Sequence, residues 1–205
     1  MQIKEILNLL DEHYPYDGKC FLEYNEPWQL LFATILSAQC TDNIVNKVTK
    51  KLFNDYKNLH DFANANINEL EQAIKQTGFY KTKAKNIKNT AVILLEKHEG
   101  KLPSDINDLT SLKGVGRKTA NIVRAHIFNI PAIAVDTHVK RVSFRLGLTN
   151  HTDPEKIEYD LMEKLPKQNW LRFNPQIISH GRAICTARKA MCKICMLKIY
   201  CKEAQ

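Results

Sequence analysis

The chain has 205 residues, enough for one large domain or for two small lobes with a buried core. It carries 30 lysine and arginine residues against 22 aspartate and glutamate residues, and the resulting formal charge of +8 suits a polyanionic partner. Charged residues interrupt the apolar N-terminal segment and no apolar run approaches a membrane span, which argues against a secretory signal and a transmembrane helix.

Apolar residues recur with helical spacing along almost the whole chain, without a convincing alternating strand pattern, so the expected fold class is all-α. Each expected helix has one apolar face that must pack on another helix. Glycines are expected to end two of them, at Gly78 and Gly100. The apolar positions place five helices in the first half of the chain: Ile3 to Leu10, Trp28 to Gln39, Ile44 to Leu52, Ile67 to Ile74 and Ala84 to Leu94.

Two of the expected helices have distinctive ends or surroundings. The segment from Trp28 to Gln39 is apolar around most of its circumference, so it should be central and buried. Later in the chain, Asp153 resembles an N-cap and Pro154 stands in the first turn, which predicts a helix that Pro166 ends. Short loops between such helices indicate a compact bundle.

The run LKGVGRKTA at residues 112–120 stands between two expected helices, the first capped at Ser104. Its two glycines let the backbone turn tightly and bring N–H groups against a phosphate, while the second helix adds the positive end of its dipole. This pattern is typical of a helix-hairpin-helix, in which Gly114, Gly116 and Arg117 position DNA without reading its bases. An ordinary glycine-rich connection between helices is the alternative.

Asp136 and His138 follow the apolar stretch at residues 131–135 and precede a further helical pattern. An aspartate in that place usually caps the helix, because its carboxylate accepts hydrogen bonds from the first-turn N–H groups. A catalytic role for Asp136 would require that Lys118, the lysine that follows Arg117 in the glycine-rich run, lies nearby in the fold. Sequence spacing does not show this. His138 is a candidate to support Asp136 or to contact phosphate, or else a structural histidine.

Six cysteines occur in the chain, and four of them lie within seventeen residues in the spacing C-x6-C-x2-C-x5-C. Such crowding indicates an intracellular metal site rather than a disulfide framework. From the spacing alone, a structural zinc site is an alternative, although zinc ribbons usually present two close pairs of cysteines. The common ferredoxin spacings do not match this pattern either. Cys20 and Cys40 have no partner by spacing and should be buried, inert thiols. The four clustered cysteines are Cys185, Cys192, Cys195 and Cys201.

Together, LKGVGRKTA at 112–120, VDTHV at 135–139, LSAQCTD at 36–42 and the cysteine spacing resemble the endonuclease III family. The resemblance extends over essentially the whole chain. It implies a two-lobed helix-hairpin-helix DNA glycosylase fold, with a six-helix lobe at residues 20–130 and an iron-sulfur cluster lobe formed by residues 1–19 together with 131–205. It also implies that the four clustered cysteines hold a [4Fe-4S] cluster.

The resemblance further implies base excision repair by a DNA glycosylase with DNA-(apurinic or apyrimidinic site) lyase activity. Lys118 would be the nucleophile and Asp136 the catalytic carboxylate, and the substrates would be damaged bases, oxidised pyrimidines above all. Arg117 and the positive end of the following helix disfavour the ammonium form of the Lys118 amine, as burial would. β-Elimination through a Schiff base would then cleave the abasic strand.

Two segments resemble those with which this family enters the duplex. Gln39 would fill the hole left by an extruded base, and a buried, locally satisfied amide is the alternative. Phe79 would be the wedge, although the family often has leucine there, and a core or capping role for Phe79 and Tyr80 is the alternative. The lysines from Lys81 to Lys88 could meet phosphates, but a charge run on a helix is more often a solvated face.

The expected partner is double-stranded DNA that contains damaged bases or abasic sites, bound by a monomer in the cytoplasm and at the nucleoid, without a membrane. A non-catalytic helix-hairpin-helix protein would explain the charge and the hairpin but not the other motifs. Mismatch-specific glycosylases are nearer alternatives. Adenine-mismatch enzymes are expected to lack the hairpin lysine and to carry an added C-terminal domain, and thymine-mismatch enzymes typically have tyrosine there, so Lys118 argues against both.

Overall fold

The computed structural model describes residues 2–204, and these residues form helices without a strand, which confirms the predicted all-α class. The chain divides into two compact units. The central unit is Cys20–Phe128, and the terminal unit combines residues up to 19 with residues from 129 onwards. Within residues 2–204, no helix has both the length and the apolar character needed to cross a bilayer.

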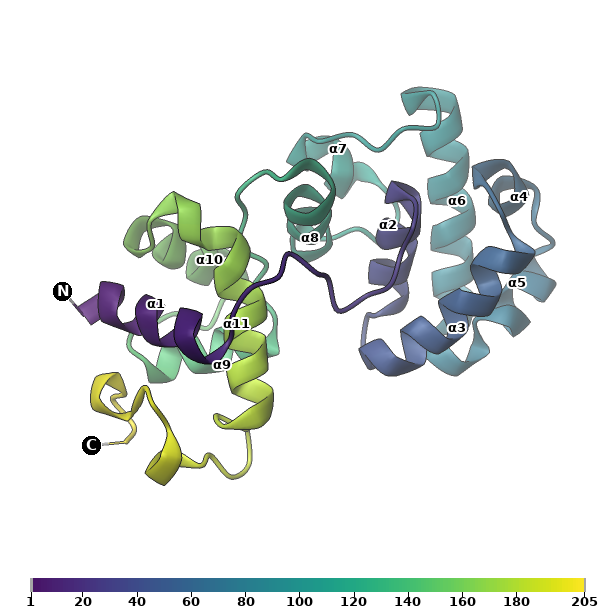
Figure 1. Ribbon diagram of the computed structural model, residues 1–205. Coiled ribbons are helices and arrows are strands. Elements are labelled where there is room, and N and C mark those ends of the chain that lie inside the picture. Colours follow the sequence, from purple (N-terminus) through teal and green to yellow (C-terminus); the bar gives the residue numbers. More distant parts are fainter. Residues whose placement is uncertain (1, 205) are drawn as a thin grey trace. The chain divides into compact units, whose positions relative to one another are not determined.

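The central unit contains seven α-helices, whereas the resemblance implied six. Residues 59–73 form two short helices, which are separated where Ala65 leaves the helical conformation and the side chain of Asn66 caps the second. The longest helix, α6, packs against both of these short helices (Figure 1). The elements are α2 (Pro27–Leu36), α3 (Asp42–Asp55), α4 (Leu59–Asn64), α5 (Ile67–Ala73), the 3₁₀ turn η1 (Lys75–Thr77), α6 (Tyr80–His98), α7 (Ile106–Ser111) and α8 (Arg117–Phe128).

Helix α2 is buried from Gln29 to Leu36, as its apolar sequence predicts. The predicted extension of this helix to Gln39 is wrong. The helix ends at Leu36, and the Ser37 hydroxyl donates a hydrogen bond to the Thr34 carbonyl at 2.8 Å, a local bond that competes with further helix. Gln39 therefore lies in an exposed turn rather than on the helix.

The terminal unit brings the two ends of the described chain together. Tyr200 donates a hydrogen bond to the Glu5 carboxylate at 3.0 Å, which joins the C-terminal segment to the first helix. Helix α11 packs against both α9 and α1 (Figure 1). The elements are α1 (Gln2–His13), α9 (Thr137–Arg145), α10 (Pro154–Lys164), η2 (Lys167–Asn169), α11 (Trp170–Ala183), η3 (Cys192–Ile194) and η4 (Lys198–Tyr200).

Three helix ends follow the capping chemistry expected from the sequence. Asp153 accepts hydrogen bonds from two first-turn N–H groups of α10, and Gly78 and Gly100 adopt the left-handed backbone that ends η1 and α6. The predicted cap of the helix before the hairpin is wrong by one residue. Asp105, not Ser104, caps α7, because its carboxylate accepts hydrogen bonds from both Asn107 N–H at 2.7 Å and Asp108 N–H at 3.3 Å.

Candidate functional site

The hairpin between α7 and α8 is anchored by its apolar residues and exposes its glycines. The Val115 N–H donates to the Leu112 carbonyl at 3.2 Å, and both side chains are buried in the core of the central unit. Gly114 lies between these two anchors in the sequence, and Gly116 follows Val115. Both glycines are exposed, next to the start of α8. The first N–H groups of a helix have no partner within it, so this surface has the geometry of an anion-binding site.

The two glycines of the hairpin are required for different reasons. Gly114 has φ +79°, and a Cβ there would lie 2.5 Å from the Nδ2 atom of Asn86, so the turn itself excludes a side chain. Gly116 does not have a left-handed backbone, and a Cβ there would meet nothing within 4 Å. The described residues therefore give no internal reason for glycine at 116, and its absent side chain leaves room for an external group to approach the backbone.

Lys118 is the second residue of α8 and its side chain is exposed. The amine is therefore accessible at the surface of its unit, with Arg117 directly before it at the start of the helix. Lys118 belongs to the central unit and Asp136 to the terminal unit.

Gln39 and Phe79 are both exposed and both have a left-handed backbone, with φ +53° and +48°. The alternative of a buried amide is therefore excluded for Gln39. Phe79 is 67% exposed and makes no side-chain capping bond to α6, whereas Tyr80 packs against the core, so a core role applies only to Tyr80. A left-handed backbone costs non-glycine residues on the order of 1–2 kcal/mol, and such strain concentrates at functional sites.

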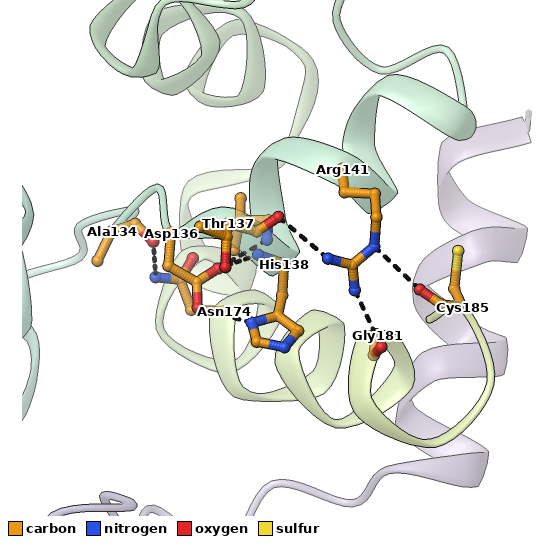
Figure 2. A network of polar contacts seen from close by, with 9 residues as sticks. Ala134, Asp136, Thr137, His138, Arg141, Asn174, Gly181 and Cys185 are labelled. Atoms are coloured by element: carbon orange, nitrogen blue, oxygen red, sulfur yellow. Dashed lines mark hydrogen bonds and ion pairs between the residues drawn. The ribbon is translucent and has the colours of Figure 1, made fainter. Parts of the chain in front are cut away.

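Asp136 caps α9, as its position in the sequence predicts (Figure 2). Its Oδ1 atom accepts hydrogen bonds from the N–H groups of His138 at 2.8 Å and Val139 at 2.7 Å. Its Oδ2 atom lies 3.1 Å from Nδ1 of the His138 ring. The two backbone hydrogen bonds hold the carboxylate in one orientation. The side chain of Asp136 is 15% exposed, so it still reaches the surface of its unit.

Arg141, which the sequence analysis did not single out, ties α9 to the end of α11 (Figure 2). Its Nη2 atom donates to the Gly181 carbonyl at 3.0 Å and its Nε atom donates to the Cys185 carbonyl at 3.1 Å. Helix C-terminal carbonyls lack partners within the helix, and an arginine is well suited to bind them. Arg141 lies five residues after Asp136, and its partners Gly181 and Cys185 are 40 and 44 residues further along the chain.

The four clustered cysteines line a single cavity of about 70 Å³ in the terminal unit. They form no disulfide. Among residues 2–204, no three histidine, cysteine, aspartate or glutamate side chains converge to hold a single metal ion. A site for one water needs roughly 10–15 Å³, so the cavity has room for a polyatomic group. Its lining cysteines are Cys185, Cys192, Cys195 and Cys201.

Polar side chains surround the cysteine cavity. Arg145 Nη1 lies 3.3 Å from the Cys185 sulfur, and the hydrogen bond to this thiol raises the pKa of the guanidinium. His180 is buried with Nε2 3.6 Å from the Cys195 sulfur and Nδ1 3.2 Å from the Tyr14 hydroxyl. Burial, followed by the nearby His13, lowers the pKa of His180 to about 4, so its ring is neutral at physiological pH. Sequence analysis missed both Arg145 and His180.

The thiols differ in their surroundings. Burial raises the pKa of the Cys195 thiol, and the charges of the three other cluster cysteines raise it further. Cys20 and Cys40 are only half-buried rather than buried as expected, because both lie in connections between helices. Burial nevertheless raises the pKa of the Cys20 thiol, which keeps it a poor nucleophile.

Comparisons with known proteins place this arrangement in a family. Residues 32–167 match the model of the HhH-GPD superfamily base excision DNA repair protein. The chain is 50% identical to the endonuclease III of Synechocystis sp., over 98% of this chain and 92% of that protein. The chain belongs to the endonuclease III family. It is 43% identical to the endonuclease III of Bacillus subtilis over 100% of this chain and 93% of that relative.

The fold gives the same result as the sequence. A solved structure of a trapped endonuclease III–DNA covalent intermediate aligns with a TM-score of 0.94 and 44% identity, over 99% of this chain and 95% of that chain. The resemblance stated from the motifs is thus confirmed. This endonuclease III family member is a base excision repair enzyme, a DNA glycosylase and abasic-site lyase.

The two hairpin glycines should respond differently to alanine. Gly114→Ala should lower the free energy of unfolding by about 1–3 kcal/mol, because the left-handed backbone is strained with a side chain and Asn86 must move. Gly116→Ala should change it by less than about 1 kcal/mol but weaken binding to duplex DNA. Urea denaturation and fluorescence anisotropy would measure the two effects, and equal destabilisation by both substitutions would contradict this reading of the turn.

Proposed function

We propose that Lys118 is the nucleophile and Asp136 the catalytic carboxylate of a bifunctional glycosylase that acts on damaged bases, oxidised pyrimidines above all, in double-stranded DNA. The observation that carries this proposal is an exposed lysine amine at the N-terminal end of α8, directly after the anion-binding turn. The solved relative, described as a trapped endonuclease III–DNA covalent intermediate, supports a covalent mechanism. A mismatch glycosylase is less favoured, because tyrosine would be typical at position 118.

The proposed reaction begins when the damaged nucleotide leaves the duplex, which costs less for a base that pairs or stacks poorly. The neutral amine of Lys118 attacks C1′ of the sugar as the bond to the base breaks, and the base leaves with its bonding electrons and takes up a proton. Loss of protons from nitrogen and opening of the sugar ring give a Schiff base. Removal of a proton from C2′ then expels the 3′ phosphate, and hydrolysis of the imine frees Lys118.

Asp136 supports this chemistry as a fixed anion. Two backbone N–H groups bind Oδ1, so the carboxylate does not rotate when charge develops nearby. A preorganised carboxylate can stabilise positive charge on the sugar and assist the proton transfers. We place His138 beside Asp136 rather than on a phosphate, because its ring nitrogen faces Oδ2.

DNA contacts are proposed for residues of the central unit that share exposure and a backbone suited to close approach. Gly114, Gly116 and Arg117 would hold a phosphate through the hairpin and the start of α8. Gln39 would occupy the hole left by the extruded base, and Phe79 would wedge into the stack. The protein would act as a monomer on lesion-containing or abasic duplex DNA, to which its positive charge adds affinity.

The four cysteines around the cavity are proposed to hold a [4Fe-4S] cluster. The donor set is four thiols around one cavity with room for a polyatomic group, and this fits an iron-sulfide core better than a single zinc ion. When bound, the cluster would keep the thiolates ionised and cross-link the C-terminal segment. Arg145 and His180 would then donate hydrogen bonds toward two of the sulfurs.

Lys118→Gln should abolish the covalent adduct that borohydride traps during reaction with abasic DNA, because the amide side chain cannot form a Schiff base. Binding to the same DNA should survive, since the hairpin backbone is unchanged. Lys97→Gln is the matched control: it removes one exposed lysine of α6 and should trap at the wild-type yield. Adduct formation at wild-type yield by Lys118→Gln would overturn the assignment and point to another amine, such as the N-terminus.

Asp136→Asn should lower single-turnover base excision about 100-fold or more, because it removes the negative charge beside the reaction. Asparagine also caps helices, so α9 should keep its start and the free energy of unfolding should change by less than about 1 kcal/mol. Parallel rate and urea measurements separate the two roles of this residue. Full activity in the asparagine variant would show that Asp136 is only a cap.

Anaerobically purified protein should contain about four iron and four acid-labile sulfide per chain. Cys192→Ser should lose most of both, whereas Cys20→Ser should keep both, because Cys20 lies outside the cavity. Colorimetric iron and sulfide assays would measure these contents. Stoichiometric zinc without sulfide in the wild-type protein would reject the cluster.

A further inference from the structure

Lys83 is a buried lysine within a run of exposed ones. Its residue is 4% exposed, while Lys81 and Lys85 on the same helix are exposed. It is thus neither a solvated lysine nor a phosphate contact, the two possibilities that the sequence offered. A buried ammonium requires hydrogen-bond partners, because an unpaired charge in the interior is very costly.

The partners of Lys83 are two main-chain carbonyls from different parts of the central unit. The Nζ atom donates to the Leu36 carbonyl at 2.8 Å and to the Thr77 carbonyl at 2.7 Å. Leu36 is the last residue of α2, and Thr77 is the last residue of η1. One cation therefore joins the ends of two helical segments, where carbonyls lack partners within the helix and carry partial negative charge.

Each of these carbonyls lies at the base of a loop that bears an exposed residue with a left-handed backbone. Gln39 comes three residues after Leu36, and Phe79 comes two residues after Thr77. Non-glycine residues keep such a backbone only where the surrounding structure holds it. The bonds from Lys83 are a link that the structure provides between both loops, in addition to their own turns.

The charge of Lys83 is better explained by this link than by packing. Burial lowers the pKa of the Lys83 ammonium, and the nearby Cys40 opposes this by favouring the charged form. An apolar side chain of similar length would fill the same volume without that penalty. What it would not supply is a pair of N–H donors for the two carbonyls.

We propose that Lys83 is a positioning residue that holds the Gln39 loop and the Phe79 loop in register, so that both side chains enter a damaged duplex together. The inference rests on the proposed DNA-entering roles of Gln39 and Phe79. Loss of the link frees the loops to move independently. Phosphate binding by the hairpin does not depend on the link, because no hairpin atom bonds to Nζ among the contacts recorded for residues 2–204.

The test uses a duplex with a tetrahydrofuran abasic-site analogue opposite 2-aminopurine, whose fluorescence changes when protein side chains alter its stacking. At saturating protein, Lys83→Met should lose at least about three-quarters of the wild-type fluorescence change, while its affinity for undamaged duplex stays within about twofold. Lys97→Met removes the same charge from the exposed last turn of α6 and should behave as wild type. An unchanged fluorescence response in folded Lys83→Met would overturn the proposal.

A double-mutant cycle in the wild-type background keeps the proposal testable even if Lys83→Met does not fold. Gln39→Ala and Phe79→Ala change exposed side chains and should each reduce affinity for the tetrahydrofuran duplex by about tenfold or more. If the loops are held in register, the double variant should lose little more than the worse single variant. If the affinity loss of the double variant equals the product of the two single losses to within twofold, the loops act independently and the proposal is overturned.

The same variants separate failure of this inference from failure of the proposed function. If neither Gln39→Ala nor Phe79→Ala alters fluorescence or affinity, their DNA-entering roles fall, and the role of Lys83 falls with them. If both alter them while Lys83→Met responds as wild type, only the Lys83 proposal is rejected. Trapping through Lys118 reports the chemical step independently in every variant.

Discussion

An α-helix leaves N–H groups without partners at its start and carbonyl groups without partners at its end, and much of this protein is organised around how those groups are satisfied. Asp136 binds the first N–H groups of α9. Arg141 binds a carbonyl near the end of α11, and Lys83 binds the last carbonyl of α2. The start of α8, beside Gly116, is the corresponding place for a phosphate. In the proposed function, residues that complete helix ends therefore also take part in recognition and chemistry.

In the proposed mechanism, the two compact units contribute different parts of the activity. The central unit carries the hairpin, the amine of Lys118 and the exposed loops of Gln39 and Phe79. Its apolar anchors, Leu112 and Val115, hold the hairpin rigid while the glycines remain accessible. Backbone contacts of this kind bind any sequence, so the proposed hairpin contacts position DNA without discriminating damaged from undamaged bases.

The terminal unit carries the carboxylate and the cysteine cavity. Arg141 and Arg145, both on α9, bond to the backbone and to the sulfur of Cys185 respectively. The helix that Asp136 begins is therefore also fastened to the cysteine segment. A group bound in the cavity would therefore stabilise the position of α9, and so of the carboxylate.

The sequence by itself determined the features that depend on neighbouring residues. Helical periodicity established the all-α class, Asp136 and Asp153 are caps because their partners are two and three residues away, and the hairpin follows from two glycines between apolar anchors. The motifs together also determined the family. The errors were local as well: Ser37 ends α2 before Gln39, and Asp105 caps α7 in place of Ser104.

Only the tertiary structure decided which polar and charged side chains bind distant partners. Lys83 stands in the same lysine-rich run as the exposed Lys81 and Lys85, but the Leu36 carbonyl that it binds is 47 residues away. Arg145 and Cys185 are 40 residues apart, and Tyr14 and His180 are 166 apart. Whether such a group is buried and bonded depends on how helices pack, and helical periodicity specifies an apolar face without specifying which distant carbonyl or thiol will lie against its edge.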